Sequence, residues 1–260
     1  MVREVAAQLP QESVLYFGDT ARVPYGGRTM PEIIRYGREI GGFLTDQGVK
    51  LILVACNTSS ALALDTLIHE LPVPLLGVID AAAAVAVRTT ACGRIGVLAT
   101  VATANSGAYE KAIAKLRSDS EVFVQSCPVL VPLIEAGRLE GEEVWTAVAS
   151  YLKPLLEKGI DTLVYGCTHY PFLDRIVADL AGSGVARVDP ASALVARAAD
   201  LMRAQDGMAP AKTRPDRYIV SGSPEHFRAL GSLFLQHTLP PVEQINLEGY
   251  RVSGGFIPRQ

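Results

Sequence analysis

The chain has 260 residues, of which 49% are hydrophobic and 20% are charged, a composition that supports a folded core and argues against disorder. Its net charge of −3 provides no broad basic field, which argues against nucleic acid as the main partner. No apolar run reaches the roughly 18 residues of a membrane span and no secretory leader is recognised, so we expect a soluble, cytoplasmic protein without membrane contact.

Apolar runs of strand length alternate with longer segments of helical period, which predicts an α/β fold with mostly parallel sheet. In chain order, strands are expected at 14–17, 51–55, 75–79, 95–99, 122–125, 162–165, 186–188 and 218–220. Helices are expected at 31–46, 59–71, 106–117, 142–158, 170–180, 191–204 and 224–234. The alanine-rich segment 81–86 is expected to be a further helix, with Asp80 as its N-cap.

One pattern occurs twice along the chain. An apolar strand runs into Cys56, followed by Asn57 and Thr58, and a second apolar strand runs into Cys167, followed by Thr168 and His169. In open α/β sheets, ligands bind beyond the carboxyl ends of the strands. If the two units belong to related lobes, the two thiols face each other across a cleft.

Two thiols on opposite sides of a small anion are suited to inversion at carbon. One thiolate removes a proton from one face, and the other thiol delivers a proton to the opposite face. A helix N-terminus lowers the pKa of a cysteine, and neighbouring hydroxyl, amide and imidazole groups can hold a carboxylate. The plainer interpretation is that Cys56 and Cys167 are small buried side chains at the ends of two strands.

The other two cysteines, Cys92 and Cys127, lack this context and are interpreted as structural. The chain has no CxxC pair, and its four histidines do not lie at zinc-ligand spacing from the cysteines. We therefore expect no metal site and no disulfide framework.

Several stretches together resemble a known family. They are DTARVPYG at 19–26, ACNTSSA at 55–61, the segments 95–103 and 105–109, CPVLVPLIE at 127–135 and GCTHYPFL at 166–173. Their sequence and order resemble the bacterial glutamate racemases of the aspartate/glutamate racemase superfamily. The resemblance implies two pseudo-symmetric lobes, each a mostly parallel sheet flanked by helices, with 1–79 plus 189–260 forming the first lobe and 80–188 the second.

The resemblance also implies roles for particular residues. Cys56 and Cys167 would be the two acid/base thiols, with His169 assisting Cys167. The substrate contacts would be Tyr25, Gly26, Asn57, Thr58, Thr168 and His169, with Thr100 and Thr103 lining the cleft and Pro24 and Glu135 in support, Glu135 as a partner of His169.

Plainer interpretations remain open for several of these residues. Pro-Tyr-Gly at 24–26 also reads as a turn. Thr100 and Thr103 also suit caps of the helix that starts near 106, Glu135 a solvated helix end, and His169 a cap of its own helix.

The implied activity is a cofactor-independent interconversion of L- and D-glutamate that supplies peptidoglycan synthesis, by a protein that binds glutamate and forms a homodimer. Two alternatives stay open. One is a related racemase or isomerase acting on aspartate, a hydantoin or a malonate. The other is a protein that binds an amino acid without turning it over.

The sequence departs from the family at its start. Family members begin with a strand and an Asp-Ser-Gly turn that contributes to the site, whereas residues 1–9 resemble the helix after that turn. We expect the start site to be assigned too far downstream, the alternative being an impaired or repurposed protein. Without that strand, neighbouring strand edges are expected to lack partners.

Overall fold

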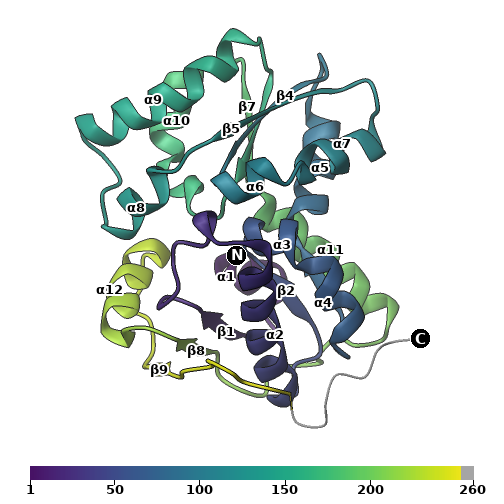
Figure 1. Cartoon of the computed structure of the whole chain (residues 1–260). Coiled ribbons are helices and arrows are strands. Elements are labelled where there is room, and N and C mark those ends of the chain that lie inside the picture. The colour runs from purple at the N-terminus through teal and green to yellow at the C-terminus, as the bar shows by residue number, and fades with distance from the viewer. Residues whose placement is uncertain (253–260) are drawn as a thin grey trace.

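A computed structural model describes residues 1–252. Figure 1 shows two sheet groups, one above the other, each flanked by helices, with the chain passing between them more than once. We refer to them as the upper and the lower sheet group. The architecture confirms the predicted α/β class with parallel strands.

The upper group is one continuous parallel sheet. Its order is β5 (Glu121–Ser126), β4 (Arg94–Ala99), β6 (Thr162–Gly166), β7 (Ala186–Val188). Strands β4 and β6 are almost entirely apolar because helices cover both faces. One face packs on α5 (Val78–Thr89) and α7 (Ala108–Leu116), and the other on α9 (Glu142–Glu157) and α10 (Asp174–Ala181).

The lower group consists of two separate sheets. One has the order β1 (Leu15–Gly18), β8 (Arg217–Val220), β9 (Val242–Gln244), and the other pairs β2 (Ile52–Val54) with β3 (Leu75–Gly77). Within residues 1–252, β1 and β2 each have a strand neighbour on one edge only. The sheet is therefore interrupted between β1 and β2, as the sequence led us to expect.

The remaining helices are α1 (Val2–Gln8), α2 (Met30–Asp46), α3 (Asn57–Leu62), α4 (Leu64–Glu70), α6 (Val101–Asn105), α8 (Leu130–Glu135), α11 (Pro190–Ala204) and α12 (Pro224–Leu235), with 3₁₀ turns η1 (Tyr25–Gly27) and η2 (Tyr170–Leu173). Hydrogen bonds in the first turn explain where several of these helices begin. The backbone N–H of Thr29 donates to Glu32 at 2.9 Å at the start of α2, and Asp189 accepts the Ala191 N–H at 2.9 Å at the start of α11.

Most predicted elements lie within a few residues of the observed ones, but several differ. The helix expected at 59–71 is split at Ala63 and begins directly after Cys56. Gly77 is the N-cap residue of α5, so Asp80 is not; it lies inside the first turn, where its charge still suits the positive end of the helix dipole. The short elements α6, α8 and β9 were not predicted. The helix expected at 170–180 begins with the 3₁₀ turn η2 and is α-helical only from Asp174.

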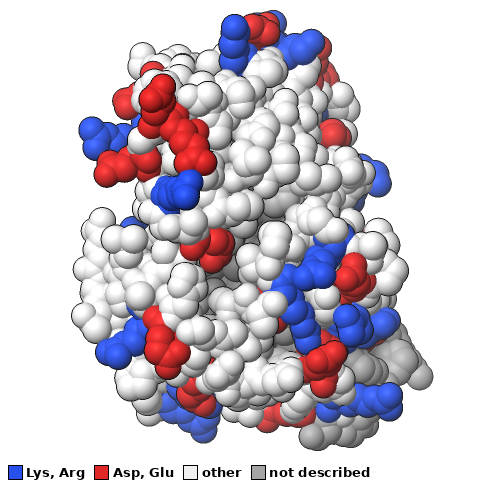
Figure 2. Space-filling model, turned by 60° about the vertical axis from the view of Figure 1, so that its left-hand side comes forward, with Lys and Arg blue, Asp and Glu red and all other residues white. Residues whose placement is uncertain are grey.

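No helix among residues 1–252 has both the length and the apolar character needed to cross a lipid bilayer. On the face drawn in Figure 2, acidic and basic side chains both occur on the upper and lower parts of the molecule. This face is hollowed between those two parts, and acidic side chains lie beside the hollow.

Candidate active site

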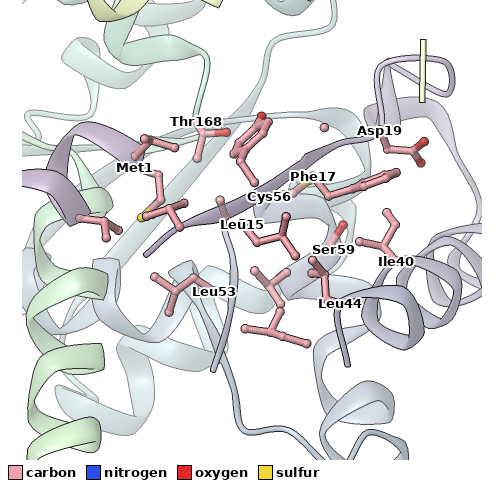
Figure 3. A pocket seen from close by; sticks show the side chains of 18 of the residues that line it. Met1, Leu15, Phe17, Asp19, Ile40, Leu44, Leu53, Cys56, Ser59 and Thr168 are labelled. Atoms are coloured by element: carbon pink, nitrogen blue, oxygen red, sulfur yellow. The ribbon is translucent and has the colours of Figure 1, made fainter. Parts of the chain in front are cut away.

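A cavity of about 940 Å³ lies between the two sheet groups and continues downward between β1 and β2. Its lining is mixed in chemistry. Apolar side chains line part of it, among them Leu15, Phe17, Ile40, Leu44 and Leu53 (Figure 3), and the charged residues Glu12, Lys50 and Arg217 line it as well. The upper end contains the polar residues that follow the two repeated strands, and both Cys56 and Cys167 line it.

Cys56 lies between the end of β2 and the first residue of α3, where it is the N-cap residue. Burial raises the pKa of its thiol, and hydrogen bonds from Ser59 and from the backbone N–H of Thr58 only partly offset this effect. The expected lowering of the pKa is therefore wrong for Cys56. The reason is that the cost of removing the thiolate from water exceeds the stabilisation available from a six-residue helix.

Cys167 follows β6 and is buried, with 7% of its surface exposed. The chain does not enter an α-helix directly after it, because the 3₁₀ turn at Tyr170–Leu173 comes first and α10 begins only at Asp174. An ionisable partner of the thiol is His169, whose Nδ1 lies 3.7 Å from Sγ. The chemical setting of Cys167 thus depends on a side chain rather than on a helix end.

His169 is held between two groups. Its Nε2 lies 2.6 Å from Glu135 Oε1 on the other side of the ring from Cys167. Burial opposes protonation of the ring, but the contacts with Cys167 and Glu135 outweigh it and raise the pKa of His169 to about 10. The same hydrogen bond lowers the pKa of Glu135. His169 is therefore a cation at neutral pH that can donate to both partners, and its side chain makes no capping hydrogen bond.

Three threonine hydroxyls form a buried triangle between the sheet groups. Thr58 Oγ1 lies 3.0 Å from Thr100 Oγ1 and 3.3 Å from Thr103 Oγ1, and the last two are 3.0 Å apart. Thr100 is also the N-cap of α6 and accepts the Thr103 N–H at 3.3 Å. The interpretation of Thr100 as a helix cap is thus confirmed, for the helix at 101–105 rather than the one near 106, and Thr100 lines the cavity as well.

The turn at 24–27 brings Tyr25 to the cavity. Tyr25 donates its hydroxyl to Asp19, and burial together with this carboxylate raises the pKa of Tyr25. Asp19 also accepts a hydrogen bond from Ser221 at 2.7 Å, so it braces the loop. A Cβ added at Gly26 would lie 2.9 Å from Thr100 Cβ, so this approach of η1 to the upper group requires glycine.

The structure brings most of the predicted site residues to one place. Those that line the cavity are Pro24, Tyr25, Gly26, Cys56, Asn57, Thr58, Thr100, Cys167, Thr168 and His169. Thr103 and Glu135 do not line it; Thr103 is hydrogen-bonded to Thr58 and Thr100, and Glu135 to His169. Glu135 instead faces a second, smaller cavity of about 280 Å³.

Several residues at or near the site were not predicted, among them Ser59, which lines the cavity and hydrogen-bonds Cys56. Cys127, interpreted from the sequence as structural, is 1% exposed yet lines the cavity. Tyr109 donates its hydroxyl to Asn57 Oδ1 at 2.7 Å. The only signal for Tyr109 was its place in one of the stretches that carry the family resemblance.

All four cysteines are free thiols. Within the described part of the chain, no cluster of three or more His, Cys, Asp or Glu side chains is arranged to hold a metal ion. The chemical groups along the cavity lining include the thiols of Cys56, Cys127 and Cys167, the imidazole of His169, and several hydroxyl and amide groups.

Comparison with known proteins agrees with this geometry. A family model described as Asp/Glu/Hydantoin racemase matches residues 1–198. The chain belongs to the Asp/Glu/Hydantoin racemase family. Among curated members, the glutamate racemase of Desulforudis audaxviator is 46% identical over 255 residues, which cover 95% of this chain and 93% of the relative.

Solved structures of the family are similar in fold. A glutamate racemase isoform of Bacillus anthracis has a TM-score of 0.91 at 32% identity, covering 95% of this chain and 92% of that one. The glutamate racemase of Francisella tularensis, solved in complex with D-glutamate, has a TM-score of 0.89 at 33% identity, covering 96% of this chain and 93% of that one.

Proposed function

We propose that this protein is a cofactor-independent glutamate racemase that interconverts L- and D-glutamate by two-base proton transfer. One observation carries the proposal: Cys56 from the lower group and Cys167 from the upper group line the same cavity, each at the end of a strand. The glutamate racemases that are 46% identical to this chain over nearly its whole length support glutamate as the substrate.

In the proposed reaction, the thiolate of one cysteine takes the α-proton of glutamate, and the electron pair is delocalised into the α-carboxylate. The thiol of the other cysteine then protonates the α-carbon from the opposite face. After one turnover the first cysteine is a thiol and the second is a thiolate. The mirror-image substrate uses the two cysteines in reverse order. The protonated His169 donates to Cys167 whenever that sulfur is a thiolate.

Polar groups at the upper end of the cavity would bind the two carboxylates and the amino group. We assign substrate contacts to Tyr25, Gly26, Asn57, Thr58, Thr168 and His169, with Thr100 at the cleft wall, Thr103 hydrogen-bonded behind it, and Pro24 and Glu135 in support. Displacement of water by the bound substrate would strengthen each of these hydrogen bonds.

Four further proposals accompany this function. The product would supply peptidoglycan synthesis in the cytoplasm, and the active species would be a homodimer, which light scattering on the purified protein tests. The lobes would comprise 1–79 plus 189–260 and 80–188, which limited proteolysis between the sheet groups tests.

The decisive experiment follows the optical signal of L- and D-glutamate by circular dichroism, with the reaction also run in heavy water. We expect deuterium at the α-carbon of both enantiomers. Cys56→Ser and Cys167→Ser should each lower turnover by about 10² or more. Cys92→Ser is the matched control, because Cys92 is exposed and does not line the cavity.

Full turnover in either Cys56→Ser or Cys167→Ser would refute the two-thiol mechanism. Aspartate, a hydantoin and a malonate are tested in parallel, and preference for one of them would redirect the substrate assignment. Calorimetric binding of glutamate without change in optical rotation would support a binding protein instead.

A further inference from the structure

Tyr109 crosses from the upper group to the lower group beside both thiols. It lies in α7, is 1% exposed, and donates its hydroxyl at 2.7 Å to Oδ1 of Asn57, the residue directly after Cys56. The two residues are 52 positions apart in sequence. This hydrogen bond therefore fixes the segment that follows the first thiol relative to the upper group.

The ring of the same tyrosine packs against the segment that carries the second thiol. A Cβ added at Gly166, the residue directly before Cys167, would lie 3.2 Å from Tyr109 Cε2 and 2.7 Å from the carbonyl oxygen of Leu98. The absence of a side chain at Gly166 thus allows the Tyr109 ring to lie there. One side chain consequently contacts the backbone before Cys167 and the amide after Cys56.

Asn57 has a donor that no group in the described part of the chain satisfies. It is 2% exposed and lines the cavity, and its Nδ2 has no hydrogen-bond partner among residues 1–252. An unsatisfied buried donor is costly, and such groups in folded proteins commonly serve a bound ligand. Nδ2 of Asn57 is therefore positioned to donate to an anionic ligand in the cavity.

The Tyr109 hydroxyl decides which end of the Asn57 amide is available for this purpose. Because the hydroxyl donates to Oδ1, a rotated amide would leave the hydroxyl hydrogen without this acceptor and turn the amide carbonyl oxygen toward the ligand. A carbonyl oxygen facing a carboxylate is repulsive rather than attractive. The tyrosine thus holds the amide in the one orientation that suits a carboxylate.

We propose that Tyr109 is a positioning residue that orients the Asn57 amide toward a substrate carboxylate and braces the two thiol-bearing segments against each other. The inference rests on the proposed function, because the carboxylate is that of glutamate. A purely structural role for the Tyr109 hydroxyl predicts a loss of stability alone, whereas positioning predicts a loss of affinity for both enantiomers.

The test is Tyr109→Phe, which keeps the ring that packs against Gly166 and removes only the hydroxyl. We expect KM for L- and D-glutamate to rise about tenfold, with kcat changing less, since about 1.4 kcal/mol for one hydrogen bond corresponds to a factor of ten. Tyr165→Phe is the matched control. Tyr165 is 2% exposed and donates to Asp174 at 2.6 Å, away from the cavity lining.

A double-mutant cycle with Asn57→Ala tests whether the Tyr109 hydroxyl affects KM through Asn57. If Tyr109 acts through Asn57, then Tyr109→Phe causes little further change in the Asn57→Ala background. Unchanged KM in Tyr109→Phe, fully additive effects in the cycle, or an equal rise in KM in Tyr165→Phe would each overturn the proposal.

Calorimetric Kd values for glutamate separate this proposal from the proposed function. If the wild-type protein binds glutamate without racemising it, the proposed function is refuted, but comparing Kd between wild type and Tyr109→Phe still tests the role of Tyr109. If the wild-type protein neither binds nor racemises glutamate, the proposed function and the role of Tyr109 are both overturned. Should Tyr109→Phe fail to fold, Asn57→Asp keeps an acceptor for Tyr109 and removes the donor, and an unchanged Kd in that variant would overturn the proposal.

Discussion

Replacing Glu135 by Gln tests how the charge on His169 is maintained. The carboxylate accepts from His169 Nε2 at 2.6 Å, and both side chains are less than one-third exposed, at 30% and 27%. Glu135→Gln keeps an oxygen acceptor of the same size and removes the negative charge. It therefore changes the electrostatics of the pair with little change in shape.

The size of the effect follows from this contact. A hydrogen bond to a charged group contributes about 1.5–3 kcal/mol, and one pKa unit corresponds to about 1.4 kcal/mol. Removing the charge should lower the pKa of His169 from about 10 to about 8–9. At about pH 9, the protonated fraction would fall from about nine-tenths to between a tenth and a half.

The sign of the change follows from the direction of the shift. The raised pKa means that protonated His169 is present below about pH 10 and is lost as the pH rises through that value. In Glu135→Gln this loss begins at lower pH. We therefore expect the alkaline limb of the kcat/KM profile to move down by about 1–2 pH units, with a smaller change near neutral pH.

The measurement is kcat/KM for L- and D-glutamate from about pH 6 to pH 10.5 by circular dichroism. Glu143→Gln is the control, because that carboxylate forms an exposed ion pair with Arg138, whose side chain is 58% exposed against 63% for Glu143. An alkaline limb at the same pH in Glu135→Gln and wild type would refute the assignment of the raised His169 pKa to Glu135.

Two further substitutions test the structure around the upper sheet. Gly166→Ala places a Cβ 2.7 Å from the Leu98 carbonyl oxygen, and such overpacking should cost about 1–3 kcal/mol of unfolding free energy in urea titrations. Although partial burial opposes it, hydrogen bonds from Thr90 and from the Cys92 backbone lower the pKa of Asp161. The stability from ionised Asp161 is therefore present above its usual pKa and lost in acid, so Asp161→Asn should destabilise the protein at pH 7 and progressively less toward pH 3.

Matched substitutions serve as controls for both. Gly184→Ala adds a methyl group that meets nothing within 4 Å, and Asp179→Asn changes an exposed carboxyl. Equal losses in Gly166→Ala and Gly184→Ala would contradict the packing argument. A pH-independent difference between Asp161→Asn and wild type would contradict the linkage argument.

The features that the sequence determined by itself are local. The run from β2 through Cys56 into a helix, and that from β6 through Cys167, follow from apolar strand residues ending in polar ones, and the structure has both. The periodicity of apolar residues also located most strands and helices, because an element that buries one face repeats apolar residues at its own structural period. The motif stretches identified the family without any knowledge of contacts.

Tertiary structure decided which of these local units meet and what surrounds them. The pairing of Tyr109 with Asn57 joins residues 52 positions apart and was not predicted. That of Glu135 with His169 joins residues 34 apart and was expected from the family resemblance alone, because no periodicity encodes such contacts. The pKa of Cys56 was predicted in the wrong direction because desolvation depends on atoms contributed by distant segments. A sequence specifies the reactive groups; their protonation, orientation and separation are set by packing between elements that are far apart along the chain.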